Sequence, residues 1–294
     1  MRVHHLNCAT LRPRPARLIH GIGSLHERGR LVTHCLLLET TAGLVLVDSG
    51  FGTRDVADAQ ARIGRVLLHT LAPQLDINET AVSQVRALGL APEDVRHIVL
   101  THADVDHIGG IDDFPWATVH IYAEEYRAIM DPTPMERRRY RSRQWNQQTR
   151  FSPHPLGGER FEGFEAVRPI PDLPSVLLVP LPGHTRGHAA VAVNSDDGWL
   201  LHAGDAYYHR AQLDPYQPFI PVGLRMMQRL GDHNHMARRH NQERLRRLRA
   251  ERGTQISILC SHDPMEFDMA VKTDAGRLGS TFTVEDDGRK RSVN

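Results

Sequence analysis

The chain has 294 residues, 40% of them hydrophobic and 24% charged, which is ordinary for a globular protein and long enough for one large domain or two small ones. Its formal net charge of +1 excludes a general electrostatic attraction to nucleic acid or to an anionic membrane. The three cysteines form no closely spaced pair, no stretch reaches the roughly 20 apolar residues of a membrane helix, and the N-terminus lacks the apolar segment of a signal peptide. We therefore expect a cytoplasmic protein without a disulfide framework.

The first half of the chain alternates between predicted strands and predicted helices. Two apolar runs between Leu31 and Asp48 flank a glycine-bearing turn, which is typical of a β-hairpin. In chain order, the expected elements are the hairpin 31–48, helices over 56–68 and 79–88, strands over 95–100 and 117–122, and a helix over 124–130. This alternation favours an α/β fold.

The second half begins with a segment of different composition. Prolines bracket residues 131–160, which we interpret as a lid or insertion, and its basic run 137–143 is either a surface that recruits an acidic substrate or, as we prefer, a solvated helix face. Apolar runs then predict strands 176–179, 189–193, 199–203 and 256–260. A long helix is expected over 224–252, with inner contacts from Leu245, Leu248 and Met236. Residues after about 269 lack periodicity and predict an irregular tail.

One short segment carries most of the chemistry. Four side chains that can bind a metal lie within six positions, directly after the strand that ends at Leu100: His102, Asp104, Asp106 and His107. Imidazole nitrogens and carboxylate oxygens are the donors that zinc, iron or manganese accept. Two glycines follow and permit a sharp turn. Because neighbouring side chains in a tight loop can face two adjacent ions, the cluster predicts part of a two-metal site.

The spacing of this cluster resembles the signature of the metallo-β-lactamase superfamily, which is His-x-His-x-Asp-His at the end of a strand. His102, Asp106 and His107 match it, and Asp104 stands where the family has its second histidine. The resemblance implies a single domain over residues 1–294, built as an αββα sandwich of two mixed β-sheets flanked by helices. It also implies a binuclear metal site in a cleft along one edge of the sheets.

Three segments further along the chain extend the resemblance. Residues 183–188 have the family's Gly-His-Thr-x-Gly-His pattern, a predicted strand ends at Asp205, and a histidine follows the last strand. The resemblance implies that one ion is held by His102, Asp104 and His184, that the other is held by Asp106, His107 and His262, and that Asp205 bridges them. It implies a packing or supporting role for His188. Asp48, after the hairpin, is either a support residue near the metals or a turn aspartate that caps a loop.

The expected cofactor is a pair of divalent ions, with zinc as the first choice. A carboxylate at Asp104 adds negative charge and a hard oxygen, which favours Mn²⁺ or Fe²⁺ and makes a bridging water less acidic. Alternatively, Asp104 does not reach the ion, and one site is then weak or empty.

Within the superfamily, the chain looks most like the N-acyl-homoserine lactonases. In that group a tyrosine three positions after the bridging aspartate points at the substrate oxygen, and Tyr208 holds this offset, although an ordinary half-buried tyrosine is the equal alternative. We predict a hydrolase in which a metal-bound hydroxide opens a lactone or another small ester, with Asp106 and Tyr208 as candidate catalytic side chains. No membrane or nucleic-acid partner is expected, and both a monomer and a homodimer stay open.

Two other functions compete with this prediction. A phosphodiesterase or nuclease of the same fold would grip phosphates with the basic run 137–143, and its binding would weaken steeply with salt. A non-catalytic homologue would keep the fold but bind metal poorly.

Overall fold

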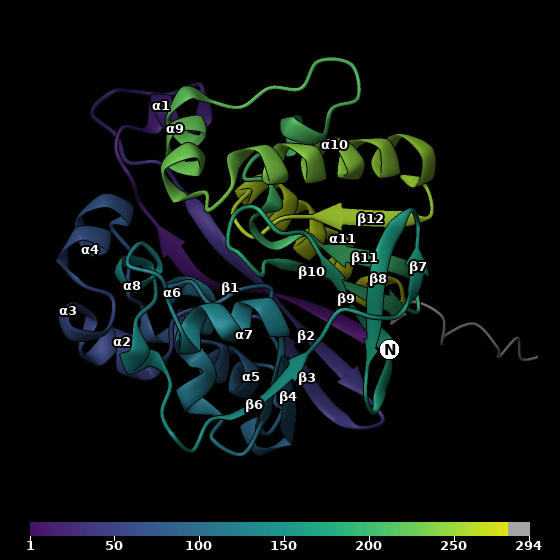
Figure 1. Ribbon diagram of the computed structural model, residues 1–294. Helices are drawn as coiled ribbons and strands as arrows, with labels where there is room; N and C mark the ends of the chain where they lie inside the picture. The colour runs from purple at the N-terminus through teal and green to yellow at the C-terminus, as the bar shows by residue number, and fades with distance from the viewer. Residues whose placement is uncertain (282–294) are drawn as a thin grey trace, which may run out of the picture.

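The computed structural model describes residues 1–281 and arranges them as two β-sheets packed face to face with helices outside (Figure 1). The first sheet has the order β1-β2-β3-β4-β5-β6 and the second β12-β11-β10-β9-β8-β7. The strands are β1 (Arg2–Leu11), β2 (Leu31–Thr40), β3 (Gly43–Val47), β4 (Val95–Val99), β5 (Thr118–Tyr122), β6 (Arg150–His154), β7 (Glu159–Phe161), β8 (Phe164–Ile170), β9 (Leu173–Pro180), β10 (Ala189–Ser195), β11 (Gly198–His202) and β12 (Ile256–Leu259). Both sheets mix parallel and antiparallel pairs, so the predicted αββα sandwich is confirmed.

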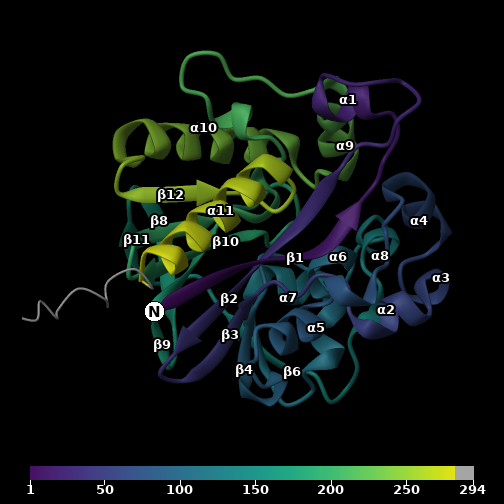
Figure 2. The ribbon, with the colours of Figure 1, turned by 180° about the vertical axis from the view of Figure 1, so that it is seen from behind.

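Helices cover the outer face of each sheet, with α10 along the second sheet in Figure 1 and α11 on the reverse side in Figure 2. The helices are α1 (Ala16–His20), α2 (Thr53–Ala57), α3 (Ala59–Arg62), α4 (Arg65–Leu71), α5 (Ala81–Ala87), α6 (Val105–Ile108), α7 (Ala123–Met130), α8 (Glu136–Arg139), α9 (Val222–Gly231), α10 (His235–Arg252) and α11 (Pro264–Thr281). Within residues 1–281, none of these helices has the length and apolar character needed to cross a bilayer.

The alternation of side chains along the inner strands divides the core into layers. Leu38 of β2 lies in a buried cluster with Val191 of the second sheet, so it faces the space between the sheets. Its neighbour Leu37 points the other way, into a cluster that includes Val85 of α5. On the far side of the second sheet, Leu245 of α10 belongs to a third cluster. Each sheet is therefore buried on both faces, which explains why its strands read as continuous apolar runs.

Several elements differ from the sequence predictions. The helix expected over 56–68 is broken into α2, α3 and α4. The helix expected over 224–252 is interrupted between α9 and α10. There the side chain of Asn234 accepts a hydrogen bond from the Ala237 N–H and caps the start of α10. Met236 is 71% exposed, so its predicted inner contact is wrong, whereas Leu245 and Leu248 are buried. The irregular tail predicted after about 269 is wrong as far as residue 281, because α11 covers it. Residues 282–294 lie outside the described part of the chain.

Strand direction brings distant loops to one edge of the sandwich. β3 and β4 are parallel, and so are β11 and β12. β9 runs in the same direction as β11 because both are antiparallel to β10. The segments that carry the predicted metal ligands follow the carboxyl ends of β4, β9, β11 and β12, so the topology places them together.

Candidate metal centre

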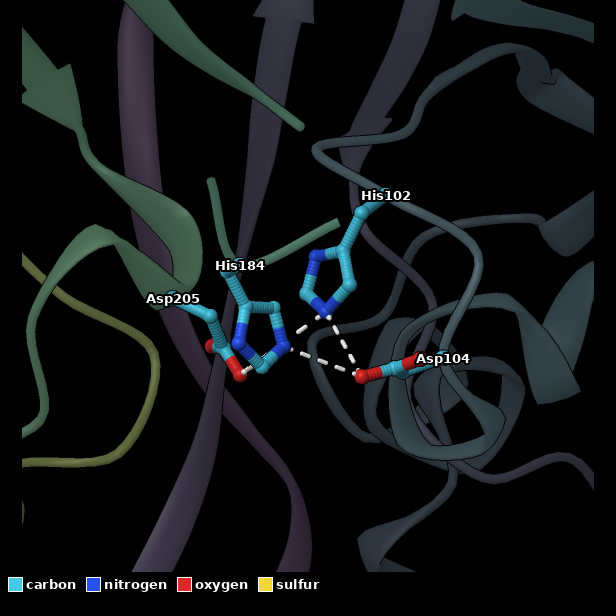
Figure 3. Close-up of side chains that lie close together, drawn as sticks. All are labelled: His102, Asp104, His184 and Asp205. Carbon is cyan, nitrogen blue, oxygen red and sulfur yellow. Dashed lines mark hydrogen bonds and ion pairs between the residues drawn. The ribbon is translucent and has the colours of Figure 1, made fainter. Parts of the chain in front are cut away.

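The structure gathers the seven predicted ligand residues into two adjacent groups. The first group contains His102, Asp104, His184 and Asp205 (Figure 3), and the second contains Asp106, His107 and His262. Within each group, one donor atom of every residue lies within 4.8 Å of the others. Asp205 lies between the groups, because its Oδ2 is 3.2 Å from Nε2 of His184 and 3.2 Å from Nε2 of His262.

Three of the imidazoles are oriented by the same arrangement. Nδ1 of His102 lies 2.9 Å from Thr101 Oγ1, Nδ1 of His107 lies 2.8 Å from Asp48 Oδ2, and Nδ1 of His262 lies 2.8 Å from the carbonyl oxygen of Val32. Each network favours the tautomer with the proton on Nδ1. The carboxylate of Asp48 and the carbonyl of Val32 can only accept, and the Thr101 hydroxyl, which donates its own proton to Asp48, can only accept from His102. Nε2 of each of these imidazoles is thereby directed into the site.

Some of these inward-facing atoms make no hydrogen bond within the protein. Within the described chain, His102 Nε2, His107 Nε2 and Asp205 Oδ1 are buried without a hydrogen bond. A buried polar atom without a partner costs about 1–3 kcal/mol, so a cluster of them indicates that something else satisfies them. Imidazole nitrogens and a carboxylate oxygen are a donor set that fits a divalent metal.

Asp48 supports the second group and the strand end that precedes the first. Its Oδ1 accepts a hydrogen bond from the Thr101 N–H at 2.8 Å, and its Oδ2 faces His107. Burial raises the pKa of Asp48, but the neighbouring imidazole of His107 holds it below its ordinary value. Asp48 therefore has both of the roles considered for it, because it caps the loop before His102 and orients the imidazole of His107.

His188 lies behind the site. Its Nε2 accepts the backbone N–H of Asp205 at 2.9 Å, and its Nδ1 lies 3.1 Å from the carbonyl oxygen of Leu181. Gly204 has a φ of +54°, and a Cβ there would lie 2.6 Å from His188 Nε2. The glycine and the histidine together therefore fix the backbone that presents Asp205.

Opposite charges determine the protonation of both groups. Burial raises the pKa of Asp205, but the imidazoles of His262 and His107 hold it well below its ordinary value. Burial lowers the pKa of His107, but the carboxylates of Asp205, Asp48 and Asp106 raise it to about 10. Asp205 and Asp106 likewise overcome burial and raise the pKa of His262 to about 9. The carboxylates of Asp48, Asp106 and Asp205 thus surround the imidazoles of the second group, which suits it to a cation.

Two residues at the site were missed by the sequence analysis. Arg139 of α8 forms a bidentate ion pair with Asp104, although the basic run had suggested a solvated face; Arg137 and Arg138 beside it are exposed. Glu125 of α7 is fully buried and accepts hydrogen bonds from the Ala103 N–H at 2.9 Å and the Gly187 N–H at 3.0 Å. It thus joins the two loops of the first group. Helical spacing gives a hint for Glu125, since Ala128 on the same face is buried, but no spacing rule singles out Arg139.

A pocket of about 970 Å³ opens onto both groups. Its floor includes Asp104, Asp106, His184, Asp205, Tyr208 and His262. Its walls are largely aliphatic: Leu18, Ile19, Leu67, Leu71, Met227 and Leu230. The Tyr208 ring lies 6.0 Å from the ring of His184 and 5.2 Å from that of His262, centroid to centroid, so Tyr208 lies beside two of the candidate ligands.

Comparison with known proteins decides the family. A family model described as the metallo-beta-lactamase superfamily matches residues 28–262. The chain belongs to this superfamily. A probable metallo-hydrolase of Mycobacterium tuberculosis is 44% identical over 275 residues, which cover 93% of this chain and 84% of that protein. An N-acyl homoserine lactonase of Bacillus thuringiensis is 27% identical over 187 residues, covering 63% of this chain and 68% of the lactonase.

Solved structures share the fold of this metallo-beta-lactamase superfamily member. An N-acyl homoserine lactone hydrolase with the product N-hexanoyl-L-homoserine bound at its catalytic metal centre superposes with a TM-score of 0.67, at 19% identity, over 91% of this chain and 95% of that one. A hydrolase described as AbOPH of the beta lactamase superfamily gives a TM-score of 0.57 at 20% identity, over 89% of this chain and 87% of that one. The predicted family and fold are confirmed, and the relatives support a metallo-hydrolase.

Proposed function

We propose that this protein hydrolyses a small ester or lactone that carries an apolar chain, with two divalent ions held by His102, Asp104, His184, Asp106, His107, His262 and the bridging Asp205. The observation that carries the proposal is the gathering of these seven side chains, some with buried donor atoms that make no hydrogen bond, at a pocket that Asp104, Asp106, His184, Asp205 and His262 line. Bound ions, zinc in our proposal, would lower the pKa of a water molecule toward about 7 and polarise a carbonyl group.

Tyr208 is proposed to act on the substrate oxygen. It lines the pocket, and burial followed by the charges of Asp205 and Asp104 raises the pKa of its hydroxyl well above the ordinary value. A tyrosine that stays protonated can donate a hydrogen bond to the carbonyl oxygen or to the leaving oxygen as negative charge develops there. Asp106 also lines the pocket, with its Oδ2 3.7 Å from His262 Nε2, and is proposed to orient or accept a proton beside the reacting carbonyl as well as to ligate.

The walls of the pocket favour an apolar substrate portion. Aliphatic side chains of α1, α4 and α9 line it, and each methylene that a substrate buries there is worth about 0.8 kcal/mol. The relatives named as N-acyl homoserine lactonases, and the related structure with N-hexanoyl-L-homoserine at its metal centre, support a lactone with an acyl chain.

The phosphodiesterase alternative has less support. Of the basic run 137–143, Arg138 and Arg139 line the pocket, and the donors of Arg139 are already directed at Asp104, His184 and the carbonyl of Gly231. Arg14, Arg28 and Arg186 also line the pocket, but aliphatic side chains form most of the wall around them, which favours an apolar substrate portion over a polyanion. The non-catalytic alternative predicts that purified protein lacks metal.

The test is hydrolysis of a panel of lactones, esters, thioesters and phosphodiesters by apo, Zn²⁺, Mn²⁺ and Fe²⁺ forms. We expect turnover of lactones or esters only in metal-loaded forms, with kcat/KM rising about three- to fourfold per added methylene until the pocket is filled. Turnover of phosphodiesters alone, with a strong dependence on salt, would contradict the proposal and favour the phosphodiesterase or nuclease alternative.

The role of Tyr208 has a matched test in its neighbour. Tyr208→Phe is expected to lower kcat about 10- to 100-fold at unchanged metal content, because it removes one donor to the developing charge. Tyr207→Phe is the control, since the Tyr207 hydroxyl donates to Glu266 at 3.0 Å behind the site. If the two variants reduce kcat equally, Tyr208 has no specific role.

We also propose a cytoplasmic location. The three cysteines Cys8, Cys35 and Cys260 are buried and free, which is typical of a reducing compartment.

A further inference from the structure

Arg139 is the permanent cation of the first group. Its Nε and Nη2 face the two carboxylate oxygens of Asp104, with Nη2 2.5 Å from Oδ2. Nη2 also lies 2.6 Å from Nε2 of His184, and Nη1 donates to the carbonyl oxygens of His184, at 3.0 Å, and of Gly231. A guanidinium has five N–H donors, and four of them are directed at oxygen atoms of the protein.

The carboxylate that Arg139 faces also faces the metal donors. Asp104 Oδ2 lies 3.3 Å from His102 Nε2 and 3.0 Å from His184 Nε2. The side chains of Arg139 and Asp104 are only 19% and 18% exposed, so water screens their charges weakly. A carboxylate has enough lone pairs to accept a bidentate arginine and still offer an oxygen to an ion.

Charge counting shows what this contact changes. With its imidazoles neutral, the first group carries the two negative charges of Asp104 and Asp205. The guanidinium of Arg139, in bidentate contact with Asp104, cancels one of them. With Arg139 included, the first group therefore carries one net negative charge. A group with an uncharged donor at position 104 and no arginine would carry the same net charge.

We propose that Arg139 is a positioning residue and a built-in counter-charge for Asp104, and that it holds the first group at a net charge that favours zinc over harder ions. The anionic, oxygen-rich character of Asp104 would raise the preference for Mn²⁺ only once the guanidinium is removed. The proposal concerns metal binding, so it stands independently of which substrate is hydrolysed.

The first test removes the two charges separately and together. In Asp104→His, the guanidinium is left beside three imidazoles and the incoming ion, so we expect the affinity for one of the two zinc ions to fall about 10- to 100-fold. In D104H/R139Q both charges are gone, and zinc affinity is expected to return to within about threefold of the parent. Chelator competition measures both affinities, and circular dichroism checks the fold. A double variant that binds zinc no better than D104H overturns the proposal.

The second test separates charge from shape. Arg139→Gln removes the charge and is expected to raise Mn²⁺ affinity relative to Zn²⁺ about tenfold, whereas Arg139→Lys keeps the charge and is expected to retain the parent ratio. The matched control is Arg137→Ala, an exposed arginine of the same helix that bonds to the carbonyl oxygen of Pro132. If R139K behaves like R139Q, or if R139Q leaves the ratio unchanged, Arg139 acts as a structural clamp and the proposal fails.

Discussion

The two groups of candidate ligands balance their negative charges in different ways. In the first, Asp104 pairs with the guanidinium of Arg139, which is charged at every accessible pH. In the second, Asp106 has its ion pairs with His107, at 4.0 Å, and His262, at 3.7 Å, which are themselves candidate ligands. Asp104 therefore has a permanently charged partner outside the donor set, whereas the charged partners of Asp106 are imidazoles whose protons a metal must replace.

This difference shows that similar donors can be prepared for a cation in two ways. The first group keeps its counter-charge when an ion binds, so its carboxylate is oriented beforehand. The second group relies on Asp48 and the Val32 carbonyl to orient its imidazoles, and it needs the ion itself for charge balance. Variants that affect both groups, one group or neither should consequently lower metal binding to successively smaller extents.

The largest effect is expected from Asp205→Ala, because Asp205 contacts both groups. Its loss leaves each group without the shared carboxylate, and we expect the protein to lose both ions and at least about 100-fold in hydrolysis while remaining folded. Metal quantification after dialysis and near-UV circular dichroism test this. Two retained equivalents of metal in the folded variant would show that Asp205 is not shared.

A change confined to the second group should spare the first. His107→Ala removes one of three donors there, and we expect loss of one ion, with about 100-fold weaker binding at that group, and loss of metal-dependent hydrolysis. The first group should keep its ion, since Arg139 and Asp104 remain. Titration of the apo variant with zinc should show one strong site. If both ions are lost together, the groups are not independent in the way described.

The loops of the first group can be loosened without touching a ligand. Glu125→Gln places an amide where the carboxylate accepts from Ala103 and Gly187, so one backbone N–H loses its acceptor, and we expect about 2 kcal/mol of destabilisation and weaker binding at the first group only. Urea unfolding measures the first effect. Glu124→Gln, in the preceding position and paired with Arg127 at the surface, should change the stability by no more than about 0.5 kcal/mol. Equal effects of the two substitutions would contradict the role of Glu125.

A histidine cluster that belongs to neither group should have the smallest effect on metal binding and should affect the pH dependence of stability instead. His120 is buried, with ring nitrogens 2.9 Å from those of His97 and His154, and burial, followed by these two neighbours, lowers its pKa to about 3. The folded state holds it neutral while the unfolded state protonates it below about pH 6.5, so its contribution is present above that pH and is lost as the pH falls toward 3. Between pH 7 and 5 the loss should be about 2 kcal/mol.

The unfolding free energy is measured against pH on chelator-treated protein, so that metal release does not contribute to its pH dependence. His120→Asn should reduce the slope of unfolding free energy against pH in that range, because asparagine does not titrate. An unchanged slope would mean that other groups cause the acid sensitivity. The contrast with His107, whose pKa the carboxylates raise to about 10, separates imidazoles buried among neutral groups from those buried among acids.

Local patterns were sufficient to predict which side chains gather at the candidate metal centre but not what surrounds them. The hairpin and the strands before His102, Asp205 and His262 are continuous apolar runs that end in polar side chains, and such runs are readable from sequence. β1 was missed because its sequence mixes histidine, asparagine and threonine with apolar residues. α11 was missed because its charged and apolar residues show little helical periodicity.

The contacts that distinguish the two groups depend on tertiary structure. Arg139 lies 35 positions from Asp104 within a run of arginines, and only the path of the chain after α7 decides which of them turns inward. Glu125 reads as one of two adjacent helical glutamates, of which one is buried by loops that arrive from β4 and β9. Spacing gives only a hint for Glu125, through the buried Ala128 on the same helix face, and none for Arg139.

The most direct test of the two-ion centre is an anomalous difference map, recorded at the zinc absorption edge from crystals of zinc-loaded protein. We expect two peaks about 3.5–4 Å apart. One should lie within about 2.0–2.2 Å of donor atoms of His102, Asp104 and His184, and the other at the same distance from those of Asp106, His107 and His262, with Asp205 next to both. Peaks elsewhere, or no peak beside these seven side chains, would contradict the assignment.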